Sequence, residues 1–204
     1  YKAGEKFGEV GIQLAERYGL SHSKCIMYFV LGAFVVHWTR HVSCALGYFK
    51  KAVLNGVEAG DALIIGYAHC LHMEIKFLMG FSLEKVSEEI RKKLKIAERL
   101  KHESLTVNAE IYDWVTSILT GQKTASLSSG AEDFKKESIP HLKQSDKSSL
   151  ATFYLHKMRL CYLAGNYREA LYAAKNGLPF MESILGFMTS AEFNFYYSLT
   201  ITAL

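Results

Sequence analysis

The sequence predicts an all-α protein, arranged as a right-handed superhelical solenoid of stacked antiparallel helix pairs. Three observations indicate this class: half of the residues are hydrophobic and only two are proline, nearly every stretch has helical periodicity, and small-residue motifs recur about every 42 residues. This composition excludes disordered and collagen-like chains. We expect one helical-repeat domain over residues 1–204. Because the sequence opens inside a helical pattern, we expect it to be a fragment of a longer multidomain chain.

Helix formers, capping residues and glycine stops define the expected helices of the first half. These are residues 2–18, 21–38, 41–59, 61–80, 83–101 and 103–120. Gly19 is expected to end the first helix, and Asp61 and Ser82 are expected N-caps. The helix over residues 83–101 is strongly amphipathic, because its apolar residues recur at spacings of three and four. That apolar stripe comprises Leu83, Val86, Ile90, Leu94, Ala97 and Leu100.

The second half is expected to contain one loop, one short element and three helices. Residues 122–130 are small and polar without a period, which predicts a loop. Pro140 is expected to shorten or kink the element over residues 132–144. The closing helices are expected over residues 148–164, 167–184 and 187–204. Both Asn-Gly pairs fall inside helical patterns, so no β-hairpin is predicted.

A recurring motif predicts that the helices are copies of one two-helix unit. Ala45, Phe49 and Ala52 have a small–aromatic–small pattern that allows two helices to approach closely. Related triplets occur about 42 residues earlier, about 41 residues later and about two periods further on. These triplets are Ala3, Phe7 and Val10; Val86, Ile90 and Lys93; and Ala170, Ala174 and Gly177. The stop glycines Gly80, Gly121 and Gly165 keep a similar spacing, which is typical of helical solenoids.

One segment resembles a tetratricopeptide repeat. Residues 160–174 (LCYLAGNYREALYAA) resemble the middle of that repeat, where a glycine, a polar residue and an aromatic turn the chain before a small residue in the second helix. Lys157 and Met158 stand where the family has a leucine and a small residue, and the unit exceeds the family's length of about 34 residues. The resemblance implies a tetratricopeptide-like array and not a standard one.

A second resemblance covers most of the chain. Its motifs are residues 16–20 (ERYGL), 34–38 (FVVHW), 58–62 (EAGDA), 69–73 (HCLHM) and 160–167 (LCYLAGNY). In order and spacing they resemble the helical region that follows the AAA-type (STAND) ATPase module in large bacterial signalling kinases. In those proteins a serine/threonine-kinase-like segment precedes the ATPase, and GAF and histidine-kinase domains often follow. The resemblance implies a regulatory or sensory scaffold, with ATP binding and phosphotransfer elsewhere in the parent chain.

Sequence motifs of phosphoryl-transfer chemistry are absent. The sequence has no GxGxxG, HRD-like or DFG motif and no GxxxxGK[ST] phosphate loop. His102 superficially matches the phosphoacceptor motif of histidine kinases, but we interpret it as a solvated histidine at a helix junction. We therefore predict no catalytic residue and no cofactor.

His69, Cys70 and His72 form the strongest candidate for metal binding. Residues three apart on a helix share a face, and imidazole with thiolate suits zinc. Further ligands would have to come from Glu74, His37 or His41, approaching from adjacent helices in the stack. We favour the alternative that these histidines are partly buried polar groups, and we predict no metal. An all-α metal-dependent enzyme using His69 and His72 remains the alternative.

Two clusters could serve as contact surfaces. Six basic residues on the amphipathic helix are expected to form a solvated outer face: Arg91, Lys92, Lys93, Lys95, Arg99 and Lys101. The aromatic run Phe193, Phe195, Tyr196 and Tyr197 cannot face one core, so either a further repeat or a partner is expected to cover it. We favour the further repeat.

Charge, cysteines and hydropathy indicate the expected environment. The formal net charge of +4 is modest, so no nucleic-acid partner is expected, although a STAND-type transcriptional regulator remains an alternative. The four cysteines lie far apart in apolar patterns, which favours free buried thiols and a cytoplasmic location. The longest apolar run, residues 25–36, is too short to cross a bilayer.

These observations predict a non-catalytic scaffold that binds a protein, a peptide, a small effector or neighbouring domains of its parent chain. In solenoids the first helix of each pair lines the concave side. The residues expected on that side are His37, Tyr67, His72, Tyr112, Tyr154 and Lys157.

Overall fold

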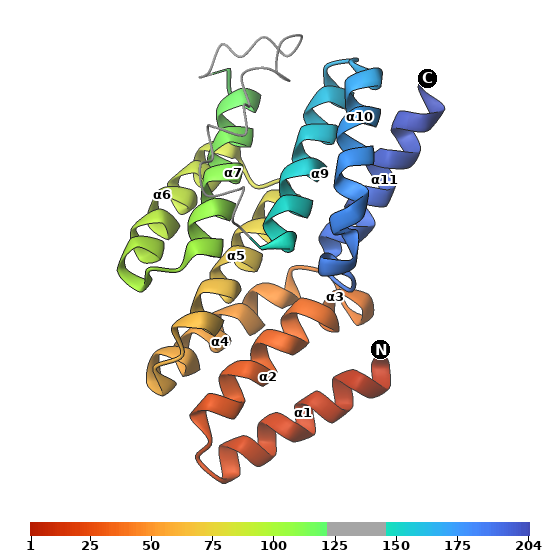
Figure 1. The fold of residues 1–204 in the computed structure, drawn as a ribbon. Helices are drawn as coiled ribbons and strands as arrows, with labels where there is room; N and C mark the ends of the chain where they lie inside the picture. Colours follow the sequence, from red (N-terminus) through yellow and green to blue (C-terminus); the bar gives the residue numbers. More distant parts are fainter. Residues whose placement is uncertain (122–145) are drawn as a thin grey trace. The chain divides into compact units, whose positions relative to one another are not determined.

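The computed structural model describes residues 1–121 and 146–204, and the regular elements within them are all helical (Figure 1). The predicted all-α class is thereby confirmed for these residues. The expected loop at 122–130 and the element at 132–144 with Pro140 lie outside the described residues. The chain divides into two compact units, Tyr1–Thr106 (unit 1) and Val107–Leu204 (unit 2). The prediction of a single helical-repeat domain stays a prediction.

Unit 1 is built from consecutive packed helices. They are α1 (Lys2–Arg17), α2 (Ser21–Phe34), α3 (Val36–Thr39), α4 (Cys44–Ala59), α5 (Ala62–Leu78), α6 (Leu83–Leu100) and the first residues of α7 (Glu103–Leu119). Helix α2 packs on α1 and on α4, α4 packs on α5, and α5 packs on α6. The contact of α2 with α4 is close, because a Cβ atom on residue 32 would lie 2.9 Å from the Phe49 ring.

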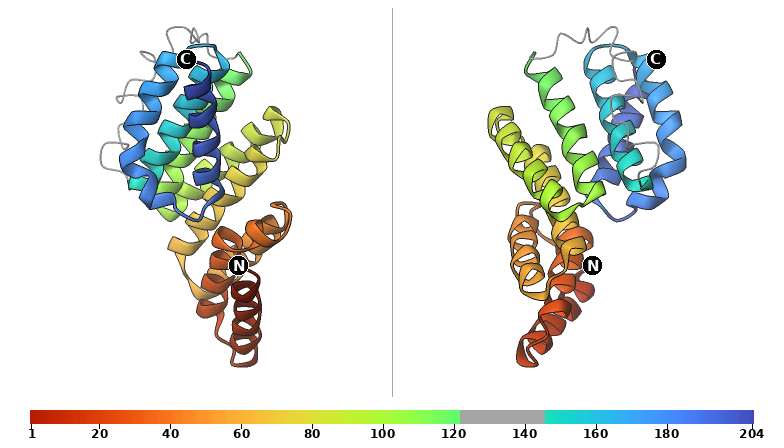
Figure 2. Two further views of the ribbon diagram at one scale, coloured as in Figure 1. Left: turned by 90° about the vertical axis from the view of Figure 1, so that its right-hand side faces the viewer. Right: turned by 60° about the vertical axis from the view of Figure 1, so that its left-hand side comes forward.

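Unit 2 contains the rest of α7 and a cluster of closing helices. These are α9 (Lys147–Leu163), α10 (Tyr167–Gly177), the 3₁₀ helix η2 (Leu178–Ile184) and α11 (Met188–Thr202). Helices α9, α10 and α11 pack on one another (Figure 2). Their shared core comprises Leu155, Met158, Cys161, Ala170, Ala173, Ala174 and Phe193.

Two expected helices are interrupted. The helix expected over residues 21–38 breaks at Val35, whose φ of −123° leaves the helical range, and resumes as the short α3. The helix expected over residues 167–184 ends as an α-helix at Gly177 and continues as η2. Pro179 explains the second change, because proline has no N–H to donate and its ring collides with the preceding α-helical turn.

The helix caps agree with the sequence in part. Asp61 caps α5 as predicted, since its Oδ1 accepts a hydrogen bond from the Ile64 N–H at 3.0 Å. Ser82 precedes α6, but its side chain makes no capping hydrogen bond. Asp146 caps α9, with Oδ1 accepting from the Ser149 N–H at 2.7 Å.

Helix starts recur at a nearly constant spacing. Five helices begin at Ser21, Ala62, Glu103, Lys147 and Met188, so consecutive starts are 41, 41, 44 and 41 residues apart. In four of these cases the residue two positions earlier has a left-handed backbone: Gly19, Gly60, Lys101 and Gly186. The predicted stops Gly80, Gly121 and Gly165 are left-handed as well. The turns before the five helix starts and the turns at Gly80, Gly121 and Gly165 therefore recur with the period seen in the sequence.

The recurring triplets are buried in three of their four copies. Ala45, Phe49 and Ala52 are inaccessible or nearly so, and the copies at 86–93 and 170–177 are also buried. The copy at Ala3, Phe7 and Val10 was wrongly expected to pack, because all three residues are exposed. Helix α1 instead buries the opposite side, where Gly8 lies against Leu31 of α2.

All four cysteines are free thiols. Cys25, Cys70 and Cys161 are buried as expected, whereas Cys44 is exposed, which corrects that expectation. None of the helices described in the two units is both long and apolar enough to cross a membrane.

A buried ion pair ties α9 to α11 within unit 2. The Arg159 guanidinium pairs with the Glu192 carboxylate, and both side chains are largely shielded from solvent. The same guanidinium lies 5.1 Å from the centre of the Tyr196 ring and 3.4 Å from Nδ1 of His156. Burial, followed by the charge of Arg159, holds the pKa of His156 well below its usual value, so the imidazole is neutral.

Replacing Lys101 with Gly is expected to stabilise the protein by about 1 kcal/mol, because glycine adopts a left-handed backbone without the steric cost of a side chain. Lys101 is the non-glycine residue with positive φ (50°) in the described chain. Urea unfolding measures the effect. The matched control Lys95→Gly, at an exposed position inside α6, should destabilise by about 1 kcal/mol. An equal loss of stability in Lys101→Gly and Lys95→Gly would contradict the left-handed backbone at Lys101.

Replacing Glu192 with Gln is expected to destabilise the protein by about 3 kcal/mol, because it removes the carboxylate that pairs with the buried Arg159 charge. The control Glu182→Gln changes the same charge at an exposed position and should alter stability by about 0.5 kcal/mol or less. Thermal or urea unfolding of the two variants gives the comparison. Similar stabilities for both would show that the pair contributes nothing.

Candidate functional site

A cavity of about 490 Å³ lies in unit 1 among α4, α5 and α6. Its apolar lining comes from α4 and from the first half of α5, and its polar lining comes mainly from α5 and α6. The lining residues are Phe49, Lys50, Val53, Leu54, Ala68, His69, His72, Lys76, Glu89 and Lys93. The volume lies within the range of pockets that hold small molecules or a few side chains. We call this cavity the unit 1 pocket.

Helical periodicity explains why these polar side chains meet. His69, His72 and Lys76 are spaced by three and four residues on α5, which places them on one face. Glu89 and Lys93 are four residues apart on α6 and form an ion pair along that helix. Because α5 packs on α6, the two sets contact each other at the lining of the pocket.

Glu89 is the centre of a hydrogen-bonded network. Its Oε2 accepts from Nζ of Lys76 at 3.0 Å, and its Oε1 lies 3.2 Å from Nζ of Lys93. Burial alone would raise the pKa of Glu89, but the hydrogen bond from Lys76 and the charge and hydrogen bond of Lys93 lower it to about 2. The carboxylate therefore stays charged at every pH at which the protein is expected to work.

Both histidines of the pocket are neutral at pH 7. Burial, followed by the charge of Lys93, lowers the pKa of His69 and of His72 to about 4 in each case. Nζ of Lys93 lies 2.9 Å from Nδ1 of His69, so the ammonium donates and that nitrogen accepts. Nδ1 of His72 is buried without a hydrogen bond, 3.6 Å from Oε1 of Glu89.

The pocket carries an excess of positive charge. Lys50, Lys76 and Lys93 supply three ammonium groups, and Glu89 supplies one carboxylate. Lys93 is buried, and burial lowers its pKa while Glu89 opposes that change. An anionic ligand would compensate the excess in a partly desolvated space, where a charge interaction is stronger than in water.

The structure places one predicted binding residue, His72, in this pocket. Tyr67 is also in unit 1, but its ring packs against Phe29 and His102. His37 is half-buried beside Trp38. In unit 2, Tyr112 and Tyr154 are buried and Lys157 is half-buried. These five residues do not line the unit 1 pocket, and their roles in binding stay predictions.

The histidine–cysteine set considered for metal binding is dispersed. His69 and His72 face the pocket, but Sγ of Cys70 lies 3.9 Å from the Ser104 carbonyl oxygen, and Nδ1 of His41 contacts the Ser43 hydroxyl. The Lys93 ammonium occupies the approach to Nδ1 of His69, which disfavours a cation there. Within residues 1–121 and 146–204, the group of three ligand atoms close enough to share an ion is a different one, His22, Cys25 and Asp61.

Sequence reasoning missed Glu89 and Lys93. The prediction of a solvated outer face is wrong for Lys93, which is buried. Its position contained the signal, because Lys93 lies three residues after Ile90 and four before Ala97, on the apolar stripe of α6.

His102 is buried and not solvated as expected. Its Nε2 donates to the Leu63 carbonyl oxygen at 3.2 Å, and its Nδ1 accepts from the Leu105 N–H at 3.1 Å. Both ring nitrogens are therefore used to join α5 to the start of α7, which is a structural task.

Comparison with known proteins gives no assignment: no protein-family model matches the chain, and no curated protein matches it. The resemblance to helical regions of bacterial signalling kinases therefore stays a prediction.

The pocket histidines are expected to make stability depend on pH. Their pKa of about 4 in the folded protein lies below the ordinary value of 6.5, so as pH falls the unfolded chain binds protons first. Their contribution is complete above about pH 6.5 and is lost between about 6.5 and 4, by roughly 2–4 kcal/mol in total after allowing for the partial exposure of His69. Urea unfolding at several pH values should show a smaller loss in His69→Asn/His72→Gln than in the unchanged protein. Identical pH profiles would contradict this.

Proposed function

We propose that this chain is a non-catalytic helical-repeat scaffold of a signal-transduction kinase, which binds an acidic segment of a partner protein in the unit 1 pocket. The observation that carries the proposal is the excess of lysine over carboxylate in a partly buried pocket. Charge complementarity across an interface increases both the association rate and the specificity.

The form of the pocket favours a segment that combines a carboxylate with an apolar group. Phe49, Val53, Leu54 and Ala68 provide an apolar wall, and the lysines stand beside it. An aliphatic side chain of the partner would pack on this wall, and an adjacent glutamate or aspartate would approach Lys50 and Lys76. The neutral histidines would serve as hydrogen-bond partners.

The scaffold proposal includes stacking of the helix pairs into a right-handed, tetratricopeptide-like superhelix. Its support is the spacing of 41, 41, 44 and 41 residues between helix starts, with a left-handed residue two positions before four of them. A constant period is expected when each helix pair buries its apolar face against the next. The motif copies at 45–52, 86–93 and 170–177 supply buried residues at this period, and the first and last of them contain small residues.

The signalling context rests on the sequence resemblance. Most of its motifs fall at chain reversals, such as residues 16–20 before α2 and 58–62 before α5, whereas residues 69–73 include His69 and His72 of the pocket. In the parent chain, the scaffold would couple partner binding to neighbouring ATPase and kinase domains. Deleting it should leave ATP hydrolysis intact and remove its regulation.

A charge reversal tests the pocket. A short fluorescent peptide of alternating Glu and Leu is expected to bind the chain, and its Gln counterpart is expected to bind much more weakly. Lys50→Glu, at the exposed edge of the pocket, should weaken binding of the Glu peptide by about 10-fold in fluorescence anisotropy.

The matched control is Lys51→Glu, which makes the same charge change on the adjacent exposed residue outside the pocket lining. It should change the affinity by about 2-fold or less, because Lys51 would act on the peptide only through the screened, long-range electric field of the protein. Equal weakening by both variants would show general charge attraction, and equal binding of the Glu and Gln peptides would refute an acidic ligand.

A further inference from the structure

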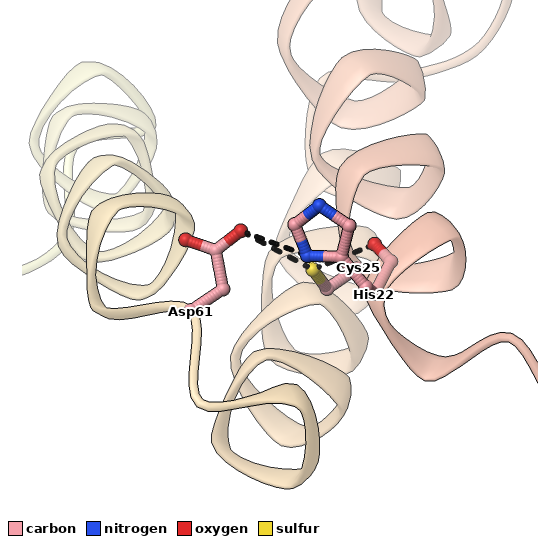
Figure 3. A group of neighbouring side chains, drawn as sticks. All are labelled: His22, Cys25 and Asp61. Carbon is pink, nitrogen blue, oxygen red and sulfur yellow. Dashed lines mark hydrogen bonds and ion pairs between the residues drawn. The ribbon is translucent and has the colours of Figure 1, made fainter.

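Three side chains of metal-binding type converge in unit 1, apart from the pocket (Figure 3). His22 and Cys25 lie three residues apart at the start of α2, so they face the same side of that helix. Asp61 lies in the turn between α4 and α5. Nδ1 of His22 is 3.4 Å from Oδ2 of Asp61, and Sγ of Cys25 is 4.0 Å from the same oxygen.

These separations match a tetrahedral ion. Zinc bonds of about 2.0–2.3 Å at tetrahedral angles place the ligand atoms roughly 3.3–3.7 Å apart. The three ligand atoms lie within 4.8 Å of one another, and the nitrogen–oxygen separation already falls in that range. The sulfur–oxygen separation of 4.0 Å exceeds the upper end of that range by a few tenths of an ångström.

Asp61 is held in the orientation that a ligand needs. Its Oδ1 accepts the capping hydrogen bond from the Ile64 N–H, which fixes the carboxylate at the start of α5. Its Oδ2 is then directed toward His22 and Cys25. Hydrogen bonds of this kind to the second oxygen commonly orient carboxylate ligands.

The charges at this cluster favour a cation. A thiolate on Cys25 would repel the Asp61 carboxylate, whose Oδ2 lies 4.0 Å from the sulfur. A divalent ion between the two groups replaces that repulsion with attraction to both. The thiol proton, which now points to the His22 carbonyl oxygen at 3.0 Å, would be released to solvent as the sulfur–metal bond forms.

We infer that His22, Cys25 and Asp61 form a zinc-binding site, with water as the fourth ligand. The mixture of nitrogen, sulfur and oxygen donors suits zinc, whereas calcium and magnesium prefer oxygen alone. The His22 side chain is 67% exposed, so the ion and its water reach the site from solvent.

Bound zinc would join the start of α2 to the turn between α4 and α5. Those elements belong to the same packed set of helices in unit 1. Zinc would therefore stabilise the folded unit, because the unfolded chain does not hold the three ligands together. This role is independent of the pocket and of any acidic partner.

Cobalt titration of the full chain tests the site. Co²⁺ alone should give sulfur-to-metal absorption in the near ultraviolet and intense visible bands typical of tetrahedral coordination, with one ion per chain. His22→Gln and Cys25→Ser should each weaken binding by at least about 10-fold. The control Cys44→Ser removes an exposed thiol and should leave the spectrum unchanged.

The variant Asp61→Asn separates the role of Asp61 as a metal ligand from its role as the N-cap of α5. Asparagine caps helices as well as aspartate does, so the metal-free melting temperature should stay within about 2 °C. Zn²⁺ in excess should raise the melting temperature of the unchanged protein by about 5 °C or more, and that of Asp61→Asn much less.

Three results would overturn the inference: absence of the sulfur-to-metal band, its loss in Cys44→Ser, or an unchanged Co²⁺ affinity in His22→Gln. Cys25 is fully buried, so Cys25→Ser could fail to fold. His22→Gln, at an exposed position, decides the question in that case.

Discussion

The close approach of helices at glycine–aromatic contacts is the constraint on which both units depend. In unit 1 a Cβ atom on residue 32 would lie 2.9 Å from the Phe49 ring and 3.0 Å from Cβ of Tyr48. In unit 2 a Cβ atom on residue 177 would lie 2.9 Å from the Phe193 ring and from Cβ of Tyr154. Tight packing of this kind leaves little room for adjustment. Phe49 is 1% exposed, yet it also lines the pocket, so the contact with Gly32 fixes one wall of the candidate site.

The same principle connects the fold to the proposed zinc site. Gly56 allows α4 to approach Ile65 of α5, since a Cβ atom there would lie 2.8 Å from Cγ1 of Ile65. The short turn that follows contains Gly60, with a left-handed backbone, and Asp61, which caps α5. Because α4 also packs on α2, this turn lies beside the start of α2, and Oδ2 of Asp61 faces Cys25. One carboxylate thereby serves both the local fold and a long-range contact.

The sequence predicted local features well and long-range polar contacts poorly. Periodicity and glycine stops predicted most helices, and Asp61 was identified as a cap, because these features depend on neighbouring residues. His72 was predicted to be a binding residue and lines the pocket, whereas its neighbour Lys93 was expected on a solvated face. Charged residues are rarely buried, and Lys93 is buried only because α6 packs on α5 and Glu89 accompanies it. Contact of Asp61 with His22 and Cys25 depends on which helices pack together, and spacing along the chain does not contain that information.

The charge networks of the two units differ in the carboxylates that accompany their cations. In unit 2, Arg159 pairs with Glu192 beside a neutral histidine. In the unit 1 pocket, Lys76 and Lys93 share the single carboxylate of Glu89, and Lys50 adds a third positive charge. Two ammonium groups on one carboxylate repel each other, and burying Lys93 costs solvation energy as well. This excess of positive charge is the feature on which the proposed acidic ligand rests.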